Sequence, residues 1–520
     1  LGENLTFYYQ KSHDLAEGNG YYNIMQGAYK ASPLVEAYDS EGNLTSWDKN
    51  GQGQYSTMIF QNPMTGLVNG EYSAININRN FGVDASMYLE IEPIKNLKWR
   101  GLMTTKFGGS TGRNFIKPFS ESSTNANGNY SLNQNISAWS SMLLNHTLSY
   151  VLPDLNGHHI DVMAGQEMQI SLWSSGLGLS GKAGSDNVNS LVLKGFDYAM
   201  MNNFTADQLS GHSGYDYRHQ TDIVSVFGRI NYNYKEKYLM TLIARGDGSK
   251  NFSRGNRWGF FPSVSAGWVI SNEKFMESTS SFMDFLKFRA SWGQNGNCNV
   301  ANFRYLSNVS FSPTAYADFT YNFLGGINNV VSNNYIQGAY LNNEPNNDLT
   351  WETSEQLDLG FDARFLDSRL GVNFDWYKKT TKDWLVLGLS DDVKGYETAA
   401  WTNDGKVENT GIEIALNWND NIGKDFHYHA TLNVATNKNR VKSLQQQLGT
   451  DQSSALFQNS SYISLVTPGH PVGYFYGMEY DGIWQTGEEI TAARAAGQTV
   501  LPGAVAGDPK WIDYDGDGEI

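Results

Sequence analysis

Residues 357–377 read LDLGFDARFLDSRLGVNFDWY, and this stretch decides the fold class. Between 357 and 365 every second residue is apolar, and the residues between them are Asp, Gly or Arg. The same alternation resumes at 370–377, after the short segment 366–369. A period of two places successive side chains on opposite faces of a strand, so the stretch predicts a β-hairpin with one apolar and one polar face.

Alternating segments of this kind recur along the chain, and about 13 strands are predicted. Short connections are expected near 93–96, 153–158, 235–237, 271–284, 366–369 and 420–425. Longer ones are expected near 12–80, 108–137, 171–220, 249–258, 295–350, 379–410 and beyond 437. Regular alternation of short and long connections is typical of a transmembrane antiparallel β-barrel with short periplasmic turns and long extracellular loops. A soluble sandwich has no reason to keep this alternation.

Aromatic residues on the apolar parity support the barrel. Several stand beside short turns, namely Tyr234, Tyr238, Phe365, Trp418 and Phe426, whereas Trp292 and Trp376 stand near the opposite strand ends. Two aromatic girdles at the membrane interfaces would produce this distribution. The alternative is that these are ordinary core aromatics on a buried sheet face.

Composition narrows the class further. The net charge of −16 argues against nucleic acid as a partner, because a phosphate backbone needs a basic surface. The single cysteine, Cys298, excludes an internal disulfide framework. No apolar run is long enough for a transmembrane helix, although barrel strands give a much weaker hydropathy signal. Because single-chain bacterial barrels close with an even number of strands, residues 1–520 are expected to be part of a longer protein.

Seven sequence blocks carry a resemblance to a known family. They are RGDGS at 245–249, RWGFFPSVSAGW at 257–268, SNE at 271–273, LKFRASWG at 286–293, NDLTWE at 347–352, GKVENTG at 405–411 and GYFYG at 473–477. In order and spacing, they resemble the SusC/RagA-type TonB-dependent outer-membrane transporters of Bacteroidetes. The resemblance extends over about residues 60–520.

This resemblance implies a barrel of about 22 strands around an N-terminal plug, located in the cell outer membrane. It also implies a SusD-like surface lipoprotein as a partner and import of oligosaccharides, or in some members peptides, driven by the TonB complex. The whole of 1–520 is then barrel domain, with the plug, the TonB-contacting segment and barrel closure outside this chain. Two other functions stay open, a passive porin and a soluble all-β glycan-binding or structural protein.

The clearest chemical motif is the acidic loop at 513–520, DYDGDGEI. Carboxylates at loop positions 1, 3 and 5, with Gly at position 6 and a backbone carbonyl at position 7, match the start of a Ca²⁺-binding loop. The predicted calcium residues are Asp513, Asp515, Asp517 and Glu519, and calcium would brace an outer loop. A plain acidic turn is the alternative.

No catalytic residues are predicted, and the protein is not expected to be an enzyme. The stretch 176–183, GLGLSGKA, falls short of a phosphate-binding loop because Ala183 stands where Ser or Thr is needed, and a flexible outer loop is expected instead. The histidine pairs at 158–159 and at 427 and 429 show no third ligand. Charges on the polar parity, such as Arg229, Arg245, Asp247, Arg289, Asp358, Asp362, Arg364 and Asp375, are interpreted as a solvated wall or plug contacts.

Substrate contacts are expected from aromatic residues in the long connections, because sugar rings stack on aromatic faces and loops carry recognition. The candidates are Trp173, Tyr215, Tyr217, Trp258, Trp384 and Trp401.

Overall fold

The computed structural model describes residues 1–15, 36–38, 40–42, 75–120, 126–184, 186–193, 199–219, 221–311, 339–388, 395–396, 398–445, 448–449, 464–514 and 516–518. The chain divides into two compact units, Leu1–Lys438 and Asn439–Ile520. The first unit contains the main sheet, and each unit is described by itself.

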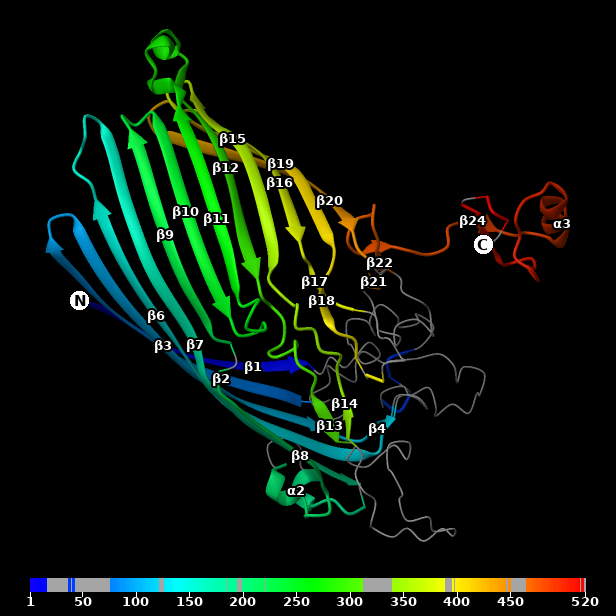
Figure 1. The fold of residues 1–520 in the computed structure, drawn as a ribbon. Coiled ribbons are helices and arrows are strands. Elements are labelled where there is room, and N and C mark those ends of the chain that lie inside the picture. Colours follow the sequence, from blue (N-terminus) through cyan, green and yellow to red (C-terminus); the bar gives the residue numbers. More distant parts are fainter. Residues whose placement is uncertain are drawn as a thin grey trace. The chain divides into compact units, whose positions relative to one another are not determined.

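The main sheet contains 14 strands, every pair of which is antiparallel. All but β8 (Leu209–Tyr217), which pairs with β7, follow one continuous path, and Figure 1 shows them as long neighbouring arrows. In path order they are β1 (Gly2–Leu15), β2 (Ile75–Ile94), β3 (Leu97–Ile116), β6 (Asn129–Val151), β7 (His158–Gly184), β9 (Ile223–Tyr234), β10 (Tyr238–Ser249), β11 (Trp258–Val269), β12 (Met283–Asn297), β15 (Glu352–Phe365), β16 (Leu370–Lys382), β19 (Lys406–Ile422) and β20 (Phe426–Ser443).

The central hairpin has the predicted register. Leu359 of β15 pairs with Trp376 of β16, and Phe361 pairs with Phe374. Across the next ladder, Phe361 faces Phe288 of β12. Apolar side chains therefore line up row by row on one face, as the alternation of the sequence predicts.

This apolar face is exposed. Leu359 retains 45% and Phe288 46% of its accessible surface, and the same holds for Leu5, Met87 and Leu432 on other strands. A soluble sandwich would bury such a face under a second sheet. The other sheets among the described residues have only two or three strands each. A wall of exposed apolar side chains backed by a polar face is what a barrel strand presents to lipid.

Short and long connections alternate as predicted, except around β11, where the connection 250–257 is shorter than the connection 270–282. The short ones are 95–96, 152–157, 235–237, 270–282, 366–369 and 423–425. The long ones contain small elements, namely β4 (Phe119–Ser120), β5 (Ala126–Asn127), α2 (Ser190–Leu193), η3 (Met201–Asn203), β13 (Val309–Phe311), β14 (Ala339–Leu341), β17 (Leu385–Leu387) and β18 (Trp401–Asn403).

For two segments, the prediction of a loop is wrong. Residues 108–116 and 129–137 pair throughout as extensions of β3 and β6, and much of 171–220 belongs to β7 and β8. These extensions are rich in Gly, Ser and Asn, so they lack the apolar alternation by which strands were recognised. Backbone hydrogen bonds continue the ladder regardless of side-chain polarity. The stretch 176–183, expected to be a flexible loop, is likewise inside β7.

The extensions of β3, β6 and β7 are covered on their apolar parity. Phe115, Leu132 and Ala183 are buried there in one cluster with Val192 and Phe204 of the following connection. This part of the sheet therefore shields its apolar residues with protein, whereas the strands nearer the short turns leave them exposed.

A carboxylate joins two short connections at the turn end of the sheet. Glu273 lies between η4 (Ile270–Asn272) and η5 (Lys274–Thr279). It accepts hydrogen bonds from Lys237 Nζ at 2.9 Å, from the Tyr238 hydroxyl at 2.8 Å and from Trp268 Nε1 at 3.3 Å. The Tyr238 and Trp268 rings stack with centroids 6.3 Å apart. An interfacial aromatic pair is thus tied to a polar anchor, as girdle residues are.

We expect Glu273→Gln to lower stability at neutral pH but not in acid. The hydrogen bonds from Lys237 and Tyr238 hold the pKa of Glu273 below its usual value. A lowered folded-state pKa gives stability that is present above the ordinary pKa and lost as pH falls through the folded-state value. Thermal unfolding followed from pH 7 down to pH 3 should show the difference between wild type and variant shrinking once the pH falls below the ordinary glutamate pKa. A difference that stays constant over this whole range would contradict the prediction.

The second unit contains β21 (Leu448–Gly449), β22 (Ser464–Val466), β23 (Tyr474–Phe475), β24 (Tyr480–Ile483), α3 (Gly487–Ala495) and β25 (Pro509–Trp511). Helix α3 begins after Thr486, whose side chain accepts a hydrogen bond from the backbone N–H of Glu489 at 3.1 Å. Ile490 and Ala493 of the helix pack against Trp484. Among the described residues, no helix is both long and apolar enough to cross a membrane.

Candidate functional site on the polar face of the sheet

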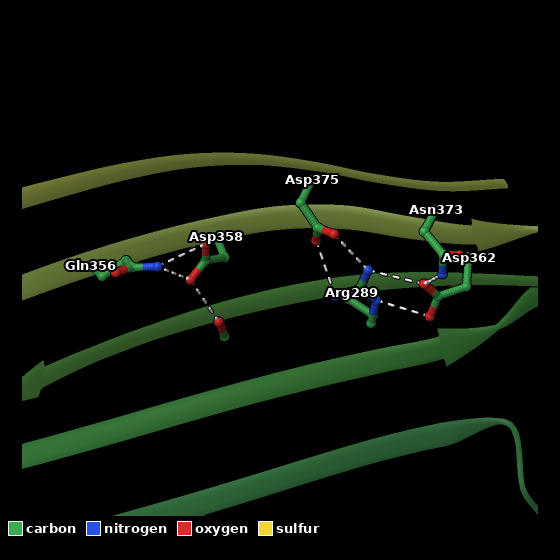
Figure 2. Close-up of polar contacts among 7 residues, drawn as sticks. Arg289, Gln356, Asp358, Asp362, Asn373 and Asp375 are labelled. Carbon is green, nitrogen blue, oxygen red and sulfur yellow. Dashed lines mark hydrogen bonds and ion pairs between the residues drawn. The ribbon is translucent and has the colours of Figure 1, made fainter. Parts of the chain in front are cut away.

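The polar face of β12, β15 and β16 is organised around Arg289 (Figure 2). Its guanidinium donates to Asp362 through Nε at 2.9 Å and Nη2 at 3.0 Å. It also contacts Asp375, through Nη1 at 3.0 Å and Nη2 at 3.1 Å. Asn373 Nδ2 donates to Asp362 at 2.7 Å. One arginine therefore bridges two carboxylates in bidentate fashion, the strongest geometry available to this pair of groups.

Gly360 gives Arg289 this reach. In the register of the sheet, Gly360 lies between Arg289 on one side and Asp375 on the other. A Cβ atom at position 360 would lie 2.6 Å from the Phe374 carbonyl oxygen and would collide with the Asp375 carboxylate. Glycine is therefore needed here so that the ion pair can form across an intervening strand.

A second network is centred on Arg245 of β10. Its Nε donates to Asp247 at 2.8 Å, and its Nη2 donates to Glu167 of β7 at 3.1 Å and to the Ser225 hydroxyl at 2.9 Å. The guanidinium also lies 5.3 Å from the centroid of the Phe227 ring. Glu167 and Ser225 were missed by the sequence reasoning, although both share a parity with known polar-face residues of their strands.

These networks define what the polar face can do. Arg245 is shared by Glu167 and Asp247, and Arg289 is shared by Asp362 and Asp375, so each network is hydrophilic and carries one excess negative charge. Such a surface suits a water-filled interior in which the two arginines are already engaged by the wall and do not hold an anionic solute. Among the described residues, no three His, Cys, Asp or Glu side chains gather in a way that could hold a metal ion.

The six aromatic candidates are not brought together. Trp173 and Trp258 lie on the apolar parity, where Trp173 contacts Phe107 with ring centroids 6.0 Å apart and Trp258 is 60% exposed. A bulge between the pairs Ser140–Trp173 and Ser141–Ser171 turns Trp173 to this side. Tyr215 and Tyr217 of β8 stack at 5.2 Å and pair with Gly176 and Ser174 of β7.

The remaining candidates, Trp384 and Trp401, belong to the long connections. Trp401 packs against a buried cluster made of Phe252, Phe261, Val300, Leu349, Trp351 and Leu385. Trp384 lies directly before β17, where its carbonyl accepts a hydrogen bond from the Asp404 N–H at 2.8 Å. Side-chain amides support this packing: Asn346 Nδ2 donates to the Trp401 carbonyl at 2.8 Å. The long connections thus fold on a core of their own.

Part of the predicted calcium loop is described. Asp513 accepts hydrogen bonds from the N–H groups of Gly516 at 2.7 Å and Gly518 at 3.0 Å, and from the Thr499 hydroxyl at 2.6 Å. The Thr499 contact and these N–H groups lower the pKa of Asp513. Gly516 and Gly518 adopt φ of +74° and +90°. Asp515 and Glu519 lie outside the described residues.

The histidines have ordinary partners. His158 Nδ1 lies 2.9 Å from the Tyr232 hydroxyl, and its ring centroid lies 4.3 Å from that of Tyr234 in a tilted arrangement. His427, near the start of β20, is hydrogen-bonded to Asn421, near the end of β19. Both are side chains of the turn end of the sheet.

Comparison with known proteins gives one family. Residues 8–513 match the model described as "TonB dependent receptor-like, beta-barrel". TonB-dependent receptor P26 of Formosa agariphila is 28% identical over 94% of this chain and 45% of its own length. TonB-dependent receptor SusC of Bacteroides thetaiotaomicron is 32% identical over 50% of this chain and 25% of its own length. The chain spans less than half the length of these relatives.

Among solved structures, the RagAB peptide importer superposes with a TM-score of 0.63 and 20% identity, covering 79% of this chain and 40% of that one. At this identity the likeness concerns the fold. It agrees with the antiparallel barrel wall seen here.

Proposed function

Because this chain belongs to the TonB-dependent receptor-like β-barrel family, we propose that the full protein imports oligosaccharides across the outer membrane, energised by TonB and assisted by a SusD-like lipoprotein. The family match over residues 8–513 is the observation that carries this proposal. The resemblance to SusC/RagA-type receptors is confirmed by the similarity to SusC and by the fold, and the chain is an outer-membrane protein.

The choice of oligosaccharides rests on chemistry of the chain. Arg245 and Arg289 are each held by two carboxylates of the wall, so they are not available to an anionic solute, which favours passage of neutral, hydroxyl-rich solutes over anionic ones. Tyr215 and Tyr217 lie beside small residues of β7, where stacked rings could receive a sugar face. Of the six aromatic candidates, these two are retained as proposed substrate contacts.

Two alternative functions predict different requirements for transport. An importer of oligopeptides would work by the same mechanism, and the fold likeness to the RagAB peptide importer favours keeping it as the second candidate. A passive porin would need neither TonB nor a lipoprotein.

The full-length protein should be purified from outer membranes in detergent, with mass spectrometry of co-purifying proteins and ligands. A SusD-like lipoprotein and bound oligosaccharide support the proposal, whereas bound peptide favours the second candidate. Uptake by cells lacking TonB provides the complementary measurement: loss of uptake supports active import. Uptake that persists without TonB would indicate a porin.

Calcium is a further part of this proposal. The N–H groups of Gly516 and Gly518 fix the Asp513 carboxylate inside the turn, as the first ligand of a calcium loop requires. Asp515, Asp517 and the Glu519 carbonyl would supply the ligands at loop positions 3, 5 and 7, and the ion would brace the loop.

We expect calcium to raise the unfolding temperature of the full-length protein after treatment with a chelator. A ligand at one hundred times its Kd stabilises the folded state by about 2.7 kcal/mol. Asp513→Asn should abolish the calcium response, and magnesium should not replace calcium because it prefers a tighter octahedral shell. Identical unfolding curves with and without calcium would show that the segment is a plain acidic turn.

A further inference from the structure

A row of aromatic side chains crosses the polar face where the strands approach the long connections. Five consecutive cross-strand pairs define the row, running from β1 to β8: Tyr8–Gly82, Gly82–Gly108, Gly108–Trp139, Trp139–Ser174 and Ser174–Tyr217. Directly opposed residues in antiparallel strands point to the same face. The rings of Tyr8, Trp139 and Tyr217 therefore share one side of the sheet.

That side is the polar one. Asp84 and Lys106 lie two residues from Gly82 and Gly108 on the same parity, and they form an ion pair at 3.7 Å. On the opposite parity of β3, Phe107 is 40% exposed and contacts the Trp173 ring on the apolar side. At this height β3 and β7 therefore carry outward aromatic residues opposite the inward row.

The glycines let two of these rings lie flat against the backbone. A Cβ atom on Gly108 would be 2.7 Å from the Trp139 ring, and one on Gly82 would touch the Tyr8 ring. Both glycines are buried, although they sit in the wall of an open face. Tyr8 itself remains 43% exposed and Tyr217 48%. The Tyr8 and Trp139 rings therefore cover a glycine with one face, whereas the Tyr217 ring stacks on Tyr215.

Hydrogen-bonding side chains flank the row on both sides. Toward the long connections lie Asn80, Ser110 and Ser137, of which the two serine hydroxyls are 2.7 Å apart. Toward the short turns lie Asp84, Lys106 and Ser141. Flat apolar rings bordered by hydroxyl, amide and carboxylate groups match the two surfaces of a sugar, whose C–H face stacks while its rim of hydroxyls forms hydrogen bonds.

We propose that this row is a binding surface for several sugar units of one neutral oligosaccharide, an inference that rests on the proposed glycan import. The rings of Tyr8 and Trp139 lie over Gly82 and Gly108, which are paired on neighbouring strands, so these two rings form one platform. Tyr217 lies three strands from Gly108, which is about 14 Å at about 4.8 Å per strand. A single sugar cannot contact both the platform and Tyr217. The row thus selects oligomers over monosaccharides.

The experiment uses the full-length receptor in detergent and a panel of malto-, cello-, xylo- and manno-oligosaccharides of four to eight units, with binding measured by calorimetry. Trp139→Ala should weaken binding of any oligosaccharide in the panel about tenfold or more. Gly108→Ala keeps all three rings but pushes Trp139 off the backbone, and it should weaken binding in the same direction. Monosaccharides should bind far more weakly than oligomers in wild type.

Phe107→Ala is the matched control, because Phe107 adjoins Gly108 in β3 and points to the apolar side. It should bind the panel like wild type. Heat-modified mobility on gels reports whether each variant is folded. If wild type binds an oligosaccharide that Trp139→Ala and Gly108→Ala bind equally well, the row is not the site and glycan import stands. If wild type binds no member of the panel but co-purifies with peptide, both the row and glycan import are overturned.

Discussion

Replacing Leu359 by Arg is expected to destabilise the protein by about 2–4 kcal/mol in a bilayer. Leu359 lies on the exposed apolar face of β15, opposite Ala290 on one side and Trp376 on the other. β15 ends at Phe365. At about 3.3 Å per residue and a tilt of about 40°, Leu359 stands about 15 Å from the turn end, near the middle of an apolar band about 25 Å tall. A guanidinium at this position is removed from water, and the lipid tails supply no negatively charged group to compensate for the lost hydration.

The measurement is the urea midpoint for folding of the full-length protein into lipid vesicles, read from heat-modified gel mobility. Gln356→Arg is the matched control, because Gln356 lies on the polar face of the same strand and donates to Asp358 at 3.0–3.1 Å. An arginine at position 356 stays in water and gains the Asp358 carboxylate, although Lys379 lies directly opposite, so its midpoint should stay within about 1 kcal/mol of wild type. Equal effects of the two substitutions would mean that the two faces are not lipid and water.

The strands around Leu359 were predicted correctly from the sequence, because successive residues there face lipid and water in turn. Alternation therefore predicted the strand pairs, such as Leu359 with Trp376, and the short turns between them. It failed where both faces meet water or protein. Residues 108–116 and 129–137 are paired strands, yet their Gly, Ser and Asn carry no period of two.

The candidate site was less predictable for a related reason. Parity identified Arg289, Asp362 and Asp375 as residues of one face, but which carboxylates share one arginine depends on register, and register depends on Gly360. Trp173 shows a second limit. A single extra residue in β7 turns its side chain to the apolar face, and nothing in the composition of the stretch marks the bulge. Packing likewise makes Trp401 part of a buried cluster.

Arg289→Met is expected to lower the free energy of unfolding by about 1–3 kcal/mol, because it leaves Asp362 and Asp375 facing each other without a cation. The side chains of Arg289, Asp362 and Asp375 are 34%, 25% and 29% exposed. Water therefore partly solvates the two unpaired carboxylates, and the loss of stability is smaller than it would be at a fully buried site. The urea midpoint of vesicle folding measures the change. Arg364→Met is the control, since Arg364 is exposed and its guanidinium lies 5.4 Å from the Phe285 ring, a contact worth about 0.5–1 kcal/mol.

The triple variant Arg289→Met, Asp362→Asn, Asp375→Asn distinguishes the effect of breaking the ion pairs from the effect of removing the arginine side chain. With both carboxylates neutral, the repulsion between them is gone, and the amide of Asn373 still has an oxygen at position 362 to which it can donate. Stability should therefore return most of the way to wild type. If Arg289→Met alone unfolds at the wild-type midpoint, the three strands are held by their backbone ladder only. Recovery in the triple variant would instead show that Arg289 stabilises the wall by offsetting the repulsion between its two carboxylates, so this arginine is engaged by the wall and not by a solute that crosses it.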